Sequence, residues 1–308
     1  MISKLKNAFL NKAIVKSDFI NEMYKQHLVL NDFAQEIKNT QVYKIEILND
    51  EIIFSFNIEN SDKKAKFYVD IADKRSTPIE SFNFNAYEYY DSKMLFKLSH
   101  GCKTVLDVGA NLGWYSIFLA LVDDEKKIYS FEPIPETFSA LKKNIALNKI
   151  DNIKTINLAL SNEEKEIEMF YSPSLTGASS FKNLQENATH TKLINTKTLD
   201  DFIQSSKINT IDFLKCDVEG AELLVIEGGM NCIKKHKPIL FLEMLRKWSH
   251  EFGYHPNEII EKLKSINYRC FKVKKTDLVE VYQISETEEA TNFFFLHNER
   301  HKDILTTN

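Results

Sequence analysis

The stretch "VLDVGANLGWYSIFLA", residues 105–120, decides the expected fold. An apolar run ends in Asp107, the glycines Gly109 and Gly113 follow four positions apart, and a long apolar segment comes next. A glycine-rich turn between a strand and a helix typically approaches a nucleotide-like ligand. A dinucleotide fingerprint reads GxGxxG, and this turn lacks the glycine that lets the backbone approach a pyrophosphate. The spacing therefore predicts close contact with a nucleotide-like ligand that has no pyrophosphate.

Segments typical of strands and helices alternate after Pro78. Strands are expected at "TVLDVG" (104–109), "KIYSFEP" (127–133), "IKTINLAL" (153–160), "IDFLKCDV" (211–218) and "PILFLEML" (238–245), with a short extra strand at "EIEMFYS" (166–172) and a polar loop over 173–192. This β-α alternation predicts an α/β protein, with a parallel sheet covered by helices on both faces. Such sheets bind ligands outside the carboxyl ends of their strands.

The first part of the chain has a different pattern. Residues 1–40 contain no Gly or Pro and predict helix, and residues 42–60 and 64–72 alternate like antiparallel strands. We therefore expect a small α+β appendage over residues 1–76 and a main domain over residues 77–308. Several roles are open for the N-terminal helix. It serves oligomerisation, which would give a homo-oligomer, or it covers the substrate, or it packs on its own domain.

Composition narrows the class of protein. The formal net charge of −4 over 308 residues gives no strong attraction to nucleic acid. No apolar run reaches the roughly 18 residues of a membrane span, and the N-terminus lacks the apolar centre of a signal peptide. The four cysteines form no CxxC pair and are expected to be buried thiols in a reducing compartment. The expected location is the cytoplasm.

Glu132 stands at the end of the second expected strand, 19 residues after Gly113. A carboxylate in this place can accept two hydrogen bonds from a ribose diol. The blocks that follow one another along residues 78–270 are "VLDVGANLGWYSI", "FEP", "LALSN", "LKCDVEGAELLVIEGG" and "ILFLE". In this order and spacing they resemble class I S-adenosylmethionine-dependent methyltransferases and, more narrowly, the FkbM family.

The resemblance implies a Rossmann-like, doubly wound, mostly parallel sheet of seven strands that binds S-adenosylmethionine. This cofactor has a ribose, no phosphate and two cationic groups, which suits a glycine turn with acidic strand ends. The cofactor-binding residues that it implies are Asp107, Gly109, Asn111, Gly113, Glu132, Pro133, Ala159, Leu160, Ser161 and Asp217, with Tyr87 and Glu88 nearby. Simpler roles remain open: Asp107 as a turn cap, Glu132 as a surface strand end, and the segment around Tyr87 as a helix packed over the sheet edge.

The sequence "KCDVEGAE" brings further carboxylates to a strand end. Asp217 ends one expected strand and Glu243 ends the next, so both should face the same crevice and form the catalytic pair. Glu222 would only favour a helix dipole. His250 is a further catalytic candidate, as is His255. The carboxylates could also hold Mg²⁺, although no ligand spacing establishes a metal site.

We therefore predict methyl transfer from S-adenosylmethionine to a hydroxyl of a carbohydrate or another hydroxylated metabolite, in surface-glycan or natural-product biosynthesis. The segment "SLTGASS" (174–180) is a candidate lid. Three alternatives remain. An N-methyltransferase often has Asn/Asp-Pro-Pro-Tyr/Phe where this chain has "DVEG". A non-catalytic scaffold would only bind the cofactor, and an NAD-dependent dehydrogenase is disfavoured by the glycine spacing.

Overall fold

The computed structural model describes residues 1–59, 61–172, 174–183 and 190–306. Its centre is an eight-stranded sheet in the order β13-β12-β14-β11-β10-β4-β5-β6. The strands are β4 (Thr104–Val108), β5 (Lys127–Phe131), β6 (Ile153–Ile156), β10 (Phe213–Cys216), β11 (Ile239–Glu243), β12 (Tyr268–Lys274), β13 (Asp277–Val281) and β14 (Asn292–His297). Neighbours from β11 to β6 are parallel, and β14, β12 and β13 are antiparallel.

The expected Rossmann-like α/β fold is confirmed, but the sheet has one strand more than the expected seven. The additional edge strand is β13, which forms a hairpin with β12. Leu278 and Val281 of β13 are buried, so the hairpin adds apolar contacts to the two faces of the sheet. This burial stabilises the pairing of β13 with the sheet edge, where the sequence "LVEVYQI" also predicts a strand.

Helices cover both faces of the sheet. Alternate residues of a strand point to opposite faces, and here Val105 and Phe213 join one apolar cluster while Leu106 and Leu214 join another. The first cluster includes α4 (Tyr89–Leu98), α5 (Trp114–Val122) and α6 (Pro135–Leu147), and the second includes α7 (Leu199–Ser205), α8 (Glu222–Gly228), α9 (Met230–His236) and α11 (Asn257–Lys264). Burial on both faces explains why β4 and β10 are apolar with few interruptions.

The N-terminal segment adds a separate three-stranded antiparallel sheet. It contains β1 (Val42–Ile47), β2 (Ile52–Asn57) and β3 (Lys64–Tyr68). Phe56 of β2 and Phe67 of β3 pack on Trp114 of α5, with ring centroids 4.9 and 5.2 Å apart. The small sheet thus shares its core with the main part of the chain, and the division at residue 76 stays a prediction.

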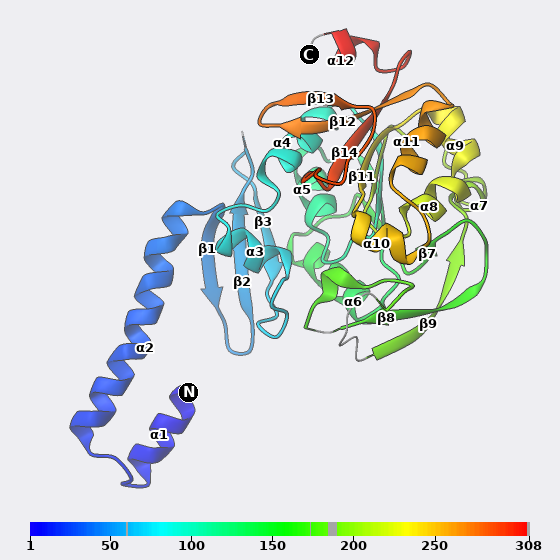
Figure 1. The fold of residues 1–308 in the computed structure, drawn as a ribbon. Helices are drawn as coiled ribbons and strands as arrows, with labels where there is room; N and C mark the ends of the chain where they lie inside the picture. The colour runs from blue at the N-terminus through cyan, green and yellow to red at the C-terminus, as the bar shows by residue number, and fades with distance from the viewer. Residues whose placement is uncertain (60, 173, 184–189, 307–308) are drawn as a thin grey trace.

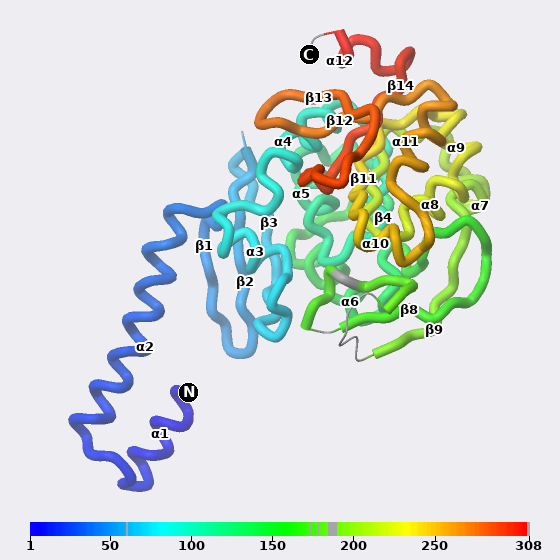
Figure 2. Tube along the Cα trace, in the orientation of Figure 1, coloured from blue at the N-terminus to red at the C-terminus, as the bar shows by residue number. Residues whose placement is uncertain are grey.

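Two N-terminal helices, α1 (Ile2–Leu10) and α2 (Lys16–Glu36), form a hairpin that projects from the body of the protein (Figures 1 and 2). Neither helix contains a buried residue. Phe33 near the end of α2 stacks on Phe82 of α3 (Thr77–Asn83), with centroids 4.9 Å apart. The helical expectation for this region is confirmed, and its role in oligomerisation stays a prediction.

The segment after β6 differs from the expectation. Residues 153–160 do not form one strand, because β7 (Ala159–Leu160) leaves the main sheet and pairs with β9 (His190–Lys197). The strand β9 also pairs with β8 (Glu166–Tyr171), the expected extra strand. Part of the expected polar loop is therefore a strand, since the β-branched residues Thr191, Ile194 and Thr196 favour extended backbone there. The remainder of that loop lies partly outside the described residues.

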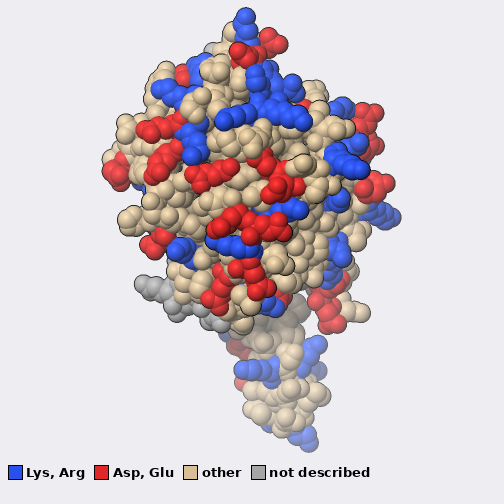
Figure 3. Space-filling view, turned by 90° about the vertical axis from the view of Figure 1, so that its right-hand side faces the viewer, with Lys and Arg blue, Asp and Glu red and all other residues tan. Residues whose placement is uncertain are grey.

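The charged side chains are mixed on the face shown in Figure 3, where Lys and Arg alternate with Asp and Glu. This distribution agrees with the near-neutral composition. All four cysteines are free and buried, as expected. Across the described residues, no helix combines the length and the apolar character needed to cross a membrane.

Candidate functional site

The turn after β4 is held by two glycines with backbone conformations that other residues rarely adopt. Gly109 has φ of 76°, and a Cβ atom on it would lie 1.8 Å from the carbonyl oxygen of Asp217. Gly113 has φ of 90°, and its Cβ would lie 2.6 Å from the Leu141 side chain. The turn can therefore follow this path only with glycine at 109, and the positive φ at 113 favours glycine there too.

Asp107 lies behind this turn and does not cap it. Its side chain is buried, and the hydroxyl of Ser116 donates a hydrogen bond of 2.5 Å to Oδ2. The other oxygen, Oδ1, lies 3.4 Å from the Lys215 ammonium. Asp107 thus fixes the base of the turn from within the core.

Glu132 is buried at the end of β5 and is not a surface strand end. Its Oε2 accepts a hydrogen bond from the backbone N–H of Asn111, and its Oε1 accepts one from the N–H of Ile134, each at 3.0 Å. Burial raises the pKa of Glu132 to about 7, against the lowering effect of these two donors. The carboxyl group therefore joins the end of β5 to the glycine turn.

A cavity of about 60 Å³ lies beside the turn. Seven of the predicted cofactor residues line it: Gly109, Asn111, Glu132, Pro133, Ala159, Leu160 and Asp217. Asp107, Gly113 and Ser161 are not in its lining. The opposite wall includes Thr176, Gly177 and Ser179 of the segment predicted to be a lid. The cavity thus lies where the sequence placed the nucleotide-like ligand.

Three carboxylates meet next to this cavity. Asp217, Glu219 and Glu243 offer oxygen atoms that all lie within 4.8 Å of one another, close enough to hold a cation. Asp217 and Glu243 meet because β10 and β11 are parallel neighbours whose carboxyl ends share one edge. Burial, and then repulsion by Asp217, raises the pKa of Glu219 and of Glu243 well above the usual range. Glu219 and Glu243 therefore retain a proton more readily than an exposed glutamate does.

Glu222 has a local structural role at the same loop. Its Oε1 accepts hydrogen bonds from the backbone N–H groups of Val218 and Gly220, at 3.0 and 3.2 Å. The hydroxyl of Tyr254 donates to its Oε2 at 3.3 Å. These bonds hold the "DVEG" loop in shape and engage both carboxylate oxygens of Glu222. The geometry therefore supports a structural role for Glu222 rather than a catalytic one.

Lys215 is a central residue of the site that the sequence analysis missed. It lies on β10 directly opposite Asp107 of β4, and its side chain is 6% exposed. Its ammonium donates a hydrogen bond of 2.7 Å to the carbonyl oxygen of Gly109 and lies 3.3 Å from Asp217. Burial disfavours the charged form, but Asp217 and Asp107 outweigh it and raise the pKa of Lys215. A single lysine within the apolar strand "FLKC" was the available signal.

Tyr87 and Glu88 border the acidic cluster from the side of α4. Glu88 accepts hydrogen bonds from the hydroxyl of Tyr115, at 2.5 Å, and from the amide of Asn292, at 2.8 Å. Asn292 of β14 lies opposite Glu243 of β11 in the strand register, so the hydrogen bond to Asn292 brings Glu88 to the β14 side of the cluster. Burial raises the pKa of Glu88. Neither Tyr87 nor Glu88 lines the cavity beside Glu132.

The structure places the two histidines apart from this cluster. His250 is exposed on α10 (Arg246–Glu251). It does not line the cavity beside Glu132 and is not part of the carboxylate cluster. His255 lies beyond α10, with its Nε2 4.0 Å from Glu286. The structure therefore joins Asp217 and Glu243 but not His250, whose catalytic role stays a prediction.

Comparison with known proteins gives related sequences with methyltransferase names. Methyltransferase 1 of Beauveria bassiana is 26% identical over 142 residues, which cover 40% of this chain and 57% of that protein. The hexuronic acid methyltransferase AglP of Haloferax volcanii is 27% identical over 128 residues, covering 42% and 50%. The 31-O-demethyl-FK506 methyltransferase FkbM of Streptomyces tacrolimicus is 28% identical over 164 residues, covering 42% and 63%. The chain thus spans between 50% and 63% of the length of these curated relatives.

A family model, described as the methyltransferase FkbM domain, matches residues 107–270. This range is more than half of the chain, and it includes the glycine turn, Glu132, Lys215 and the three clustered carboxylates. The chain therefore belongs to the FkbM family of methyltransferases.

Proposed function

We propose that this methyltransferase moves a methyl group from S-adenosylmethionine to a hydroxyl of a carbohydrate or another hydroxylated metabolite. The observation that supports it most is the position of the Asp217 and Glu243 carboxylates beside the cavity that Glu132 and Gly109 line. The names of two relatives agree with this choice, since one names a hexuronic acid and the other a 31-O-demethyl compound.

The residues of the cavity fit S-adenosylmethionine. Among the described residues, the side-chain oxygen Oδ1 of Asn111 is buried without a hydrogen-bond partner, although the residue lines the cavity. An unpaired buried acceptor is costly, and an amino or hydroxyl group of the cofactor would satisfy it. Glu132 would accept hydrogen bonds from the ribose diol, and Leu158 and Leu160 offer apolar contacts for the adenine. When bound, the cofactor supplies a methyl group on a positively charged sulfur.

The acidic cluster would activate the acceptor. A sugar hydroxyl is a weak nucleophile at neutral pH and needs a group that takes its proton. Lys215 pairs with Asp217 at 3.3 Å and so stabilises negative charge there, whereas burial favours a proton on Glu243. We assign Asp217 as the proton acceptor, and Glu243 as the group that orients the hydroxyl toward the methyl group.

The segment Thr176–Ser180 would act as a lid. A cavity of 60 Å³ is far below the roughly 300–1,000 Å³ of ligand sites, so a cofactor needs more room. The hydroxyl of Thr176 donates to Asp73 at 2.5 Å, and the hydroxyl of Ser180 donates to the carbonyl oxygen of Glu219 at 2.8 Å. These two hydrogen bonds hold the segment over the cavity, and their release would admit the cofactor.

The first test compares two cofactors. We expect calorimetry to show S-adenosylmethionine and S-adenosylhomocysteine binding with micromolar dissociation constants and NAD not binding, because the turn lacks the pyrophosphate-approaching glycine. Labelled methyl transfer to sugar nucleotides, glycan fragments and matched amines then tests the acceptor. Tight NAD binding would contradict the cofactor, and transfer to amines alone would contradict O-methylation. Cofactor binding without transfer to any acceptor would favour the scaffold alternative.

Replacing Glu132 with glutamine is expected to weaken S-adenosylmethionine binding by about tenfold or more, since hydrogen bonds to a charged group contribute roughly 1.5–3 kcal/mol each. Because the pKa of Glu132 is about 7, its ionised form is gained as pH rises from about 6 to 8. The affinity of the unmodified protein should therefore increase over this range, and the Glu132→Gln variant should lose that increase. Calorimetry at several pH values measures both effects, with the exposed Glu136→Gln as control. An unchanged dissociation constant would place the ribose elsewhere.

A further inference from the structure

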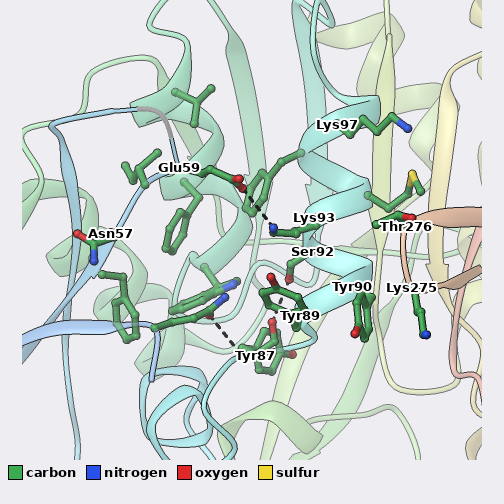
Figure 4. Close-up of a pocket in the computed structure, with 18 residues that line it drawn as sticks. Asn57, Glu59, Tyr87, Tyr89, Tyr90, Ser92, Lys93, Lys97, Lys275 and Thr276 are labelled. Carbon is green, nitrogen blue, oxygen red and sulfur yellow. Dashed lines mark hydrogen bonds and ion pairs between the residues drawn. The ribbon is translucent and has the colours of Figure 1, made fainter. Parts of the chain in front are cut away.

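A second cavity lies between β2, α4 and α5 (Figure 4). Its volume of about 600 Å³ falls within the range of about 300–1,000 Å³ of small-molecule sites. None of the residues that line it lines the cavity beside Glu132. It is therefore distinct from the cavity beside Glu132, although Tyr87, which borders the acidic cluster, is one of its lining residues.

The walls of this second cavity are aromatic. Phe56 comes from β2, Phe96 from α4, and Trp114 and Phe118 from α5. These rings also pack on one another, with Trp114 and Phe118 centroids 4.7 Å apart. Their mutual contacts hold the walls in place without a ligand. These rings offer contact area to an apolar chain or ring.

Lysines gather at the same cavity. Lys93 and Lys97 project from α4, one helical turn apart, and Lys275 comes from the turn between β12 and β13 (Figure 4). Among the described residues that line the cavity, the only carboxylate is Glu59, whose Oε2 lies 3.7 Å from Lys93. In the described part of the chain, Lys97 and Lys275 form no ion pair. Two cations thus remain uncompensated beside an aromatic wall.

We propose that this cavity binds an amphipathic anion. Its apolar body, a chain or a ring, would lie against Trp114 and Phe118, and its phosphate, sulfate or carboxylate would lie near Lys97 and Lys275. Apolar contact supplies affinity in proportion to the area that it covers, and the two ammonium groups select the charge. The proposal does not depend on methyl transfer, so the two can fail separately.

The test uses n-decyl phosphate below its micelle concentration as the chain probe and 1-naphthyl phosphate as the ring probe. Calorimetry on the unmodified protein should show saturable micromolar binding of at least one of them. Decyl maltoside should bind at least tenfold more weakly, and inorganic phosphate alone should not bind detectably. The chain has two tryptophans, so in a Trp248→Phe variant the emission of Trp114 reports the cavity directly. Saturable binding of the matching probe should change that emission.

Two variants test the two halves of the proposal. The Lys97→Gln/Lys275→Gln double variant should weaken probe binding by about tenfold or more, since charge-assisted contacts are the stronger ones. Lys154→Gln/Lys234→Gln removes the same charge from exposed positions outside the cavity and should change nothing. Val122→Asp places a carboxylate at the half-exposed end of the wall and should also weaken binding, with thermal unfolding confirming the fold.

Several outcomes would overturn the proposal. Absence of saturable binding by both phosphates would remove the site. Equal affinity for decyl maltoside, or an unchanged affinity in the Lys97/Lys275 double variant, would remove the role of the cations. Binding that leaves the emission of Trp114 unaltered would place the probe elsewhere on the protein.

Discussion

Replacing Lys215 with methionine is expected to lower the free energy of unfolding by about 3–5 kcal/mol, because it removes the buried cation that pairs with two carboxylates, of which Asp107 is buried with it. Asp107 and Asp217 lie 3.4 and 3.3 Å from the Lys215 ammonium, and the carbonyl oxygen of Gly109 accepts its hydrogen bond at 2.7 Å. All three acceptors would be left facing an apolar side chain. Methionine is close to lysine in length, so the loss reports charge and hydrogen bonding more than volume.

Urea unfolding at neutral pH measures this effect, and Lys154→Met at an exposed position is the matched control, with an expected change within about 0.5 kcal/mol. Because the pKa of Lys215 is raised in the folded protein, the stability that its charge contributes is fully present at neutral pH. This contribution is lost only as pH rises through the folded-state pKa of Lys215. A loss below about 1 kcal/mol at neutral pH would show that water enters the site and replaces the ammonium.

Turnover is expected to fall by about 10²–10⁴-fold in Asp217→Asn or Glu243→Gln, if the pair handles the proton of the acceptor. Both substitutions keep the size of the side chain and remove its acid–base chemistry. Cofactor affinity should stay within a few-fold of the unmodified protein, because the Glu132 end of the cavity is intact. Labelled methyl transfer at saturating cofactor measures turnover, calorimetry measures affinity, and the exposed Glu251→Gln is the control.

Other results of the same experiment assign the cluster differently. If Asp217, Glu219 and Glu243 hold a cation, a chelator should abolish activity and added Mg²⁺ should restore it. Loss of cofactor affinity with intact turnover would mean that the carboxylates bind the ammonium group of the donor. Full activity in both variants and in chelator would contradict the proposed roles and make His250 and His255 the next residues to replace.

The sequence was sufficient for the parts of the site that follow from strand order. Asp107, Glu132, Asp217 and Glu243 stand at or next to the ends of parallel strands, and such ends share one edge of the sheet. Their proximity therefore follows from β-α alternation alone. The glycine positions were also readable, since a turn that approaches another backbone excludes a Cβ atom.

Contacts between distant parts of the chain were not readable in the same way. Glu88 and Asn292 are separated by 204 residues and meet only because β14 returns beside β11. Lys215 resembles a surface interruption in its strand until both faces of the sheet are known to be covered. The strand β9 is polar at several positions because its sheet is small and partly exposed, so composition favoured a loop. In each case tertiary pairing outweighed the local pattern.

The absence of a side chain at Gly109 has a consequence for engineering. A Cβ atom at this position would lie 1.8 Å from the carbonyl oxygen of Asp217, so the turn after β4 and the loop after β10 are in backbone contact. Lys215 joins these two loops through its hydrogen bond to Gly109 and its ion pair with Asp217. The two loops are therefore coupled, and a substitution that shifts one loop also shifts the other. Under the proposed function, a substitution in these loops that enlarges the pocket for donors with bulkier alkyl groups would also displace Asp217. Room is better created on the opposite wall, at Thr176 or Ser179, where the covering segment is tied by side-chain hydrogen bonds.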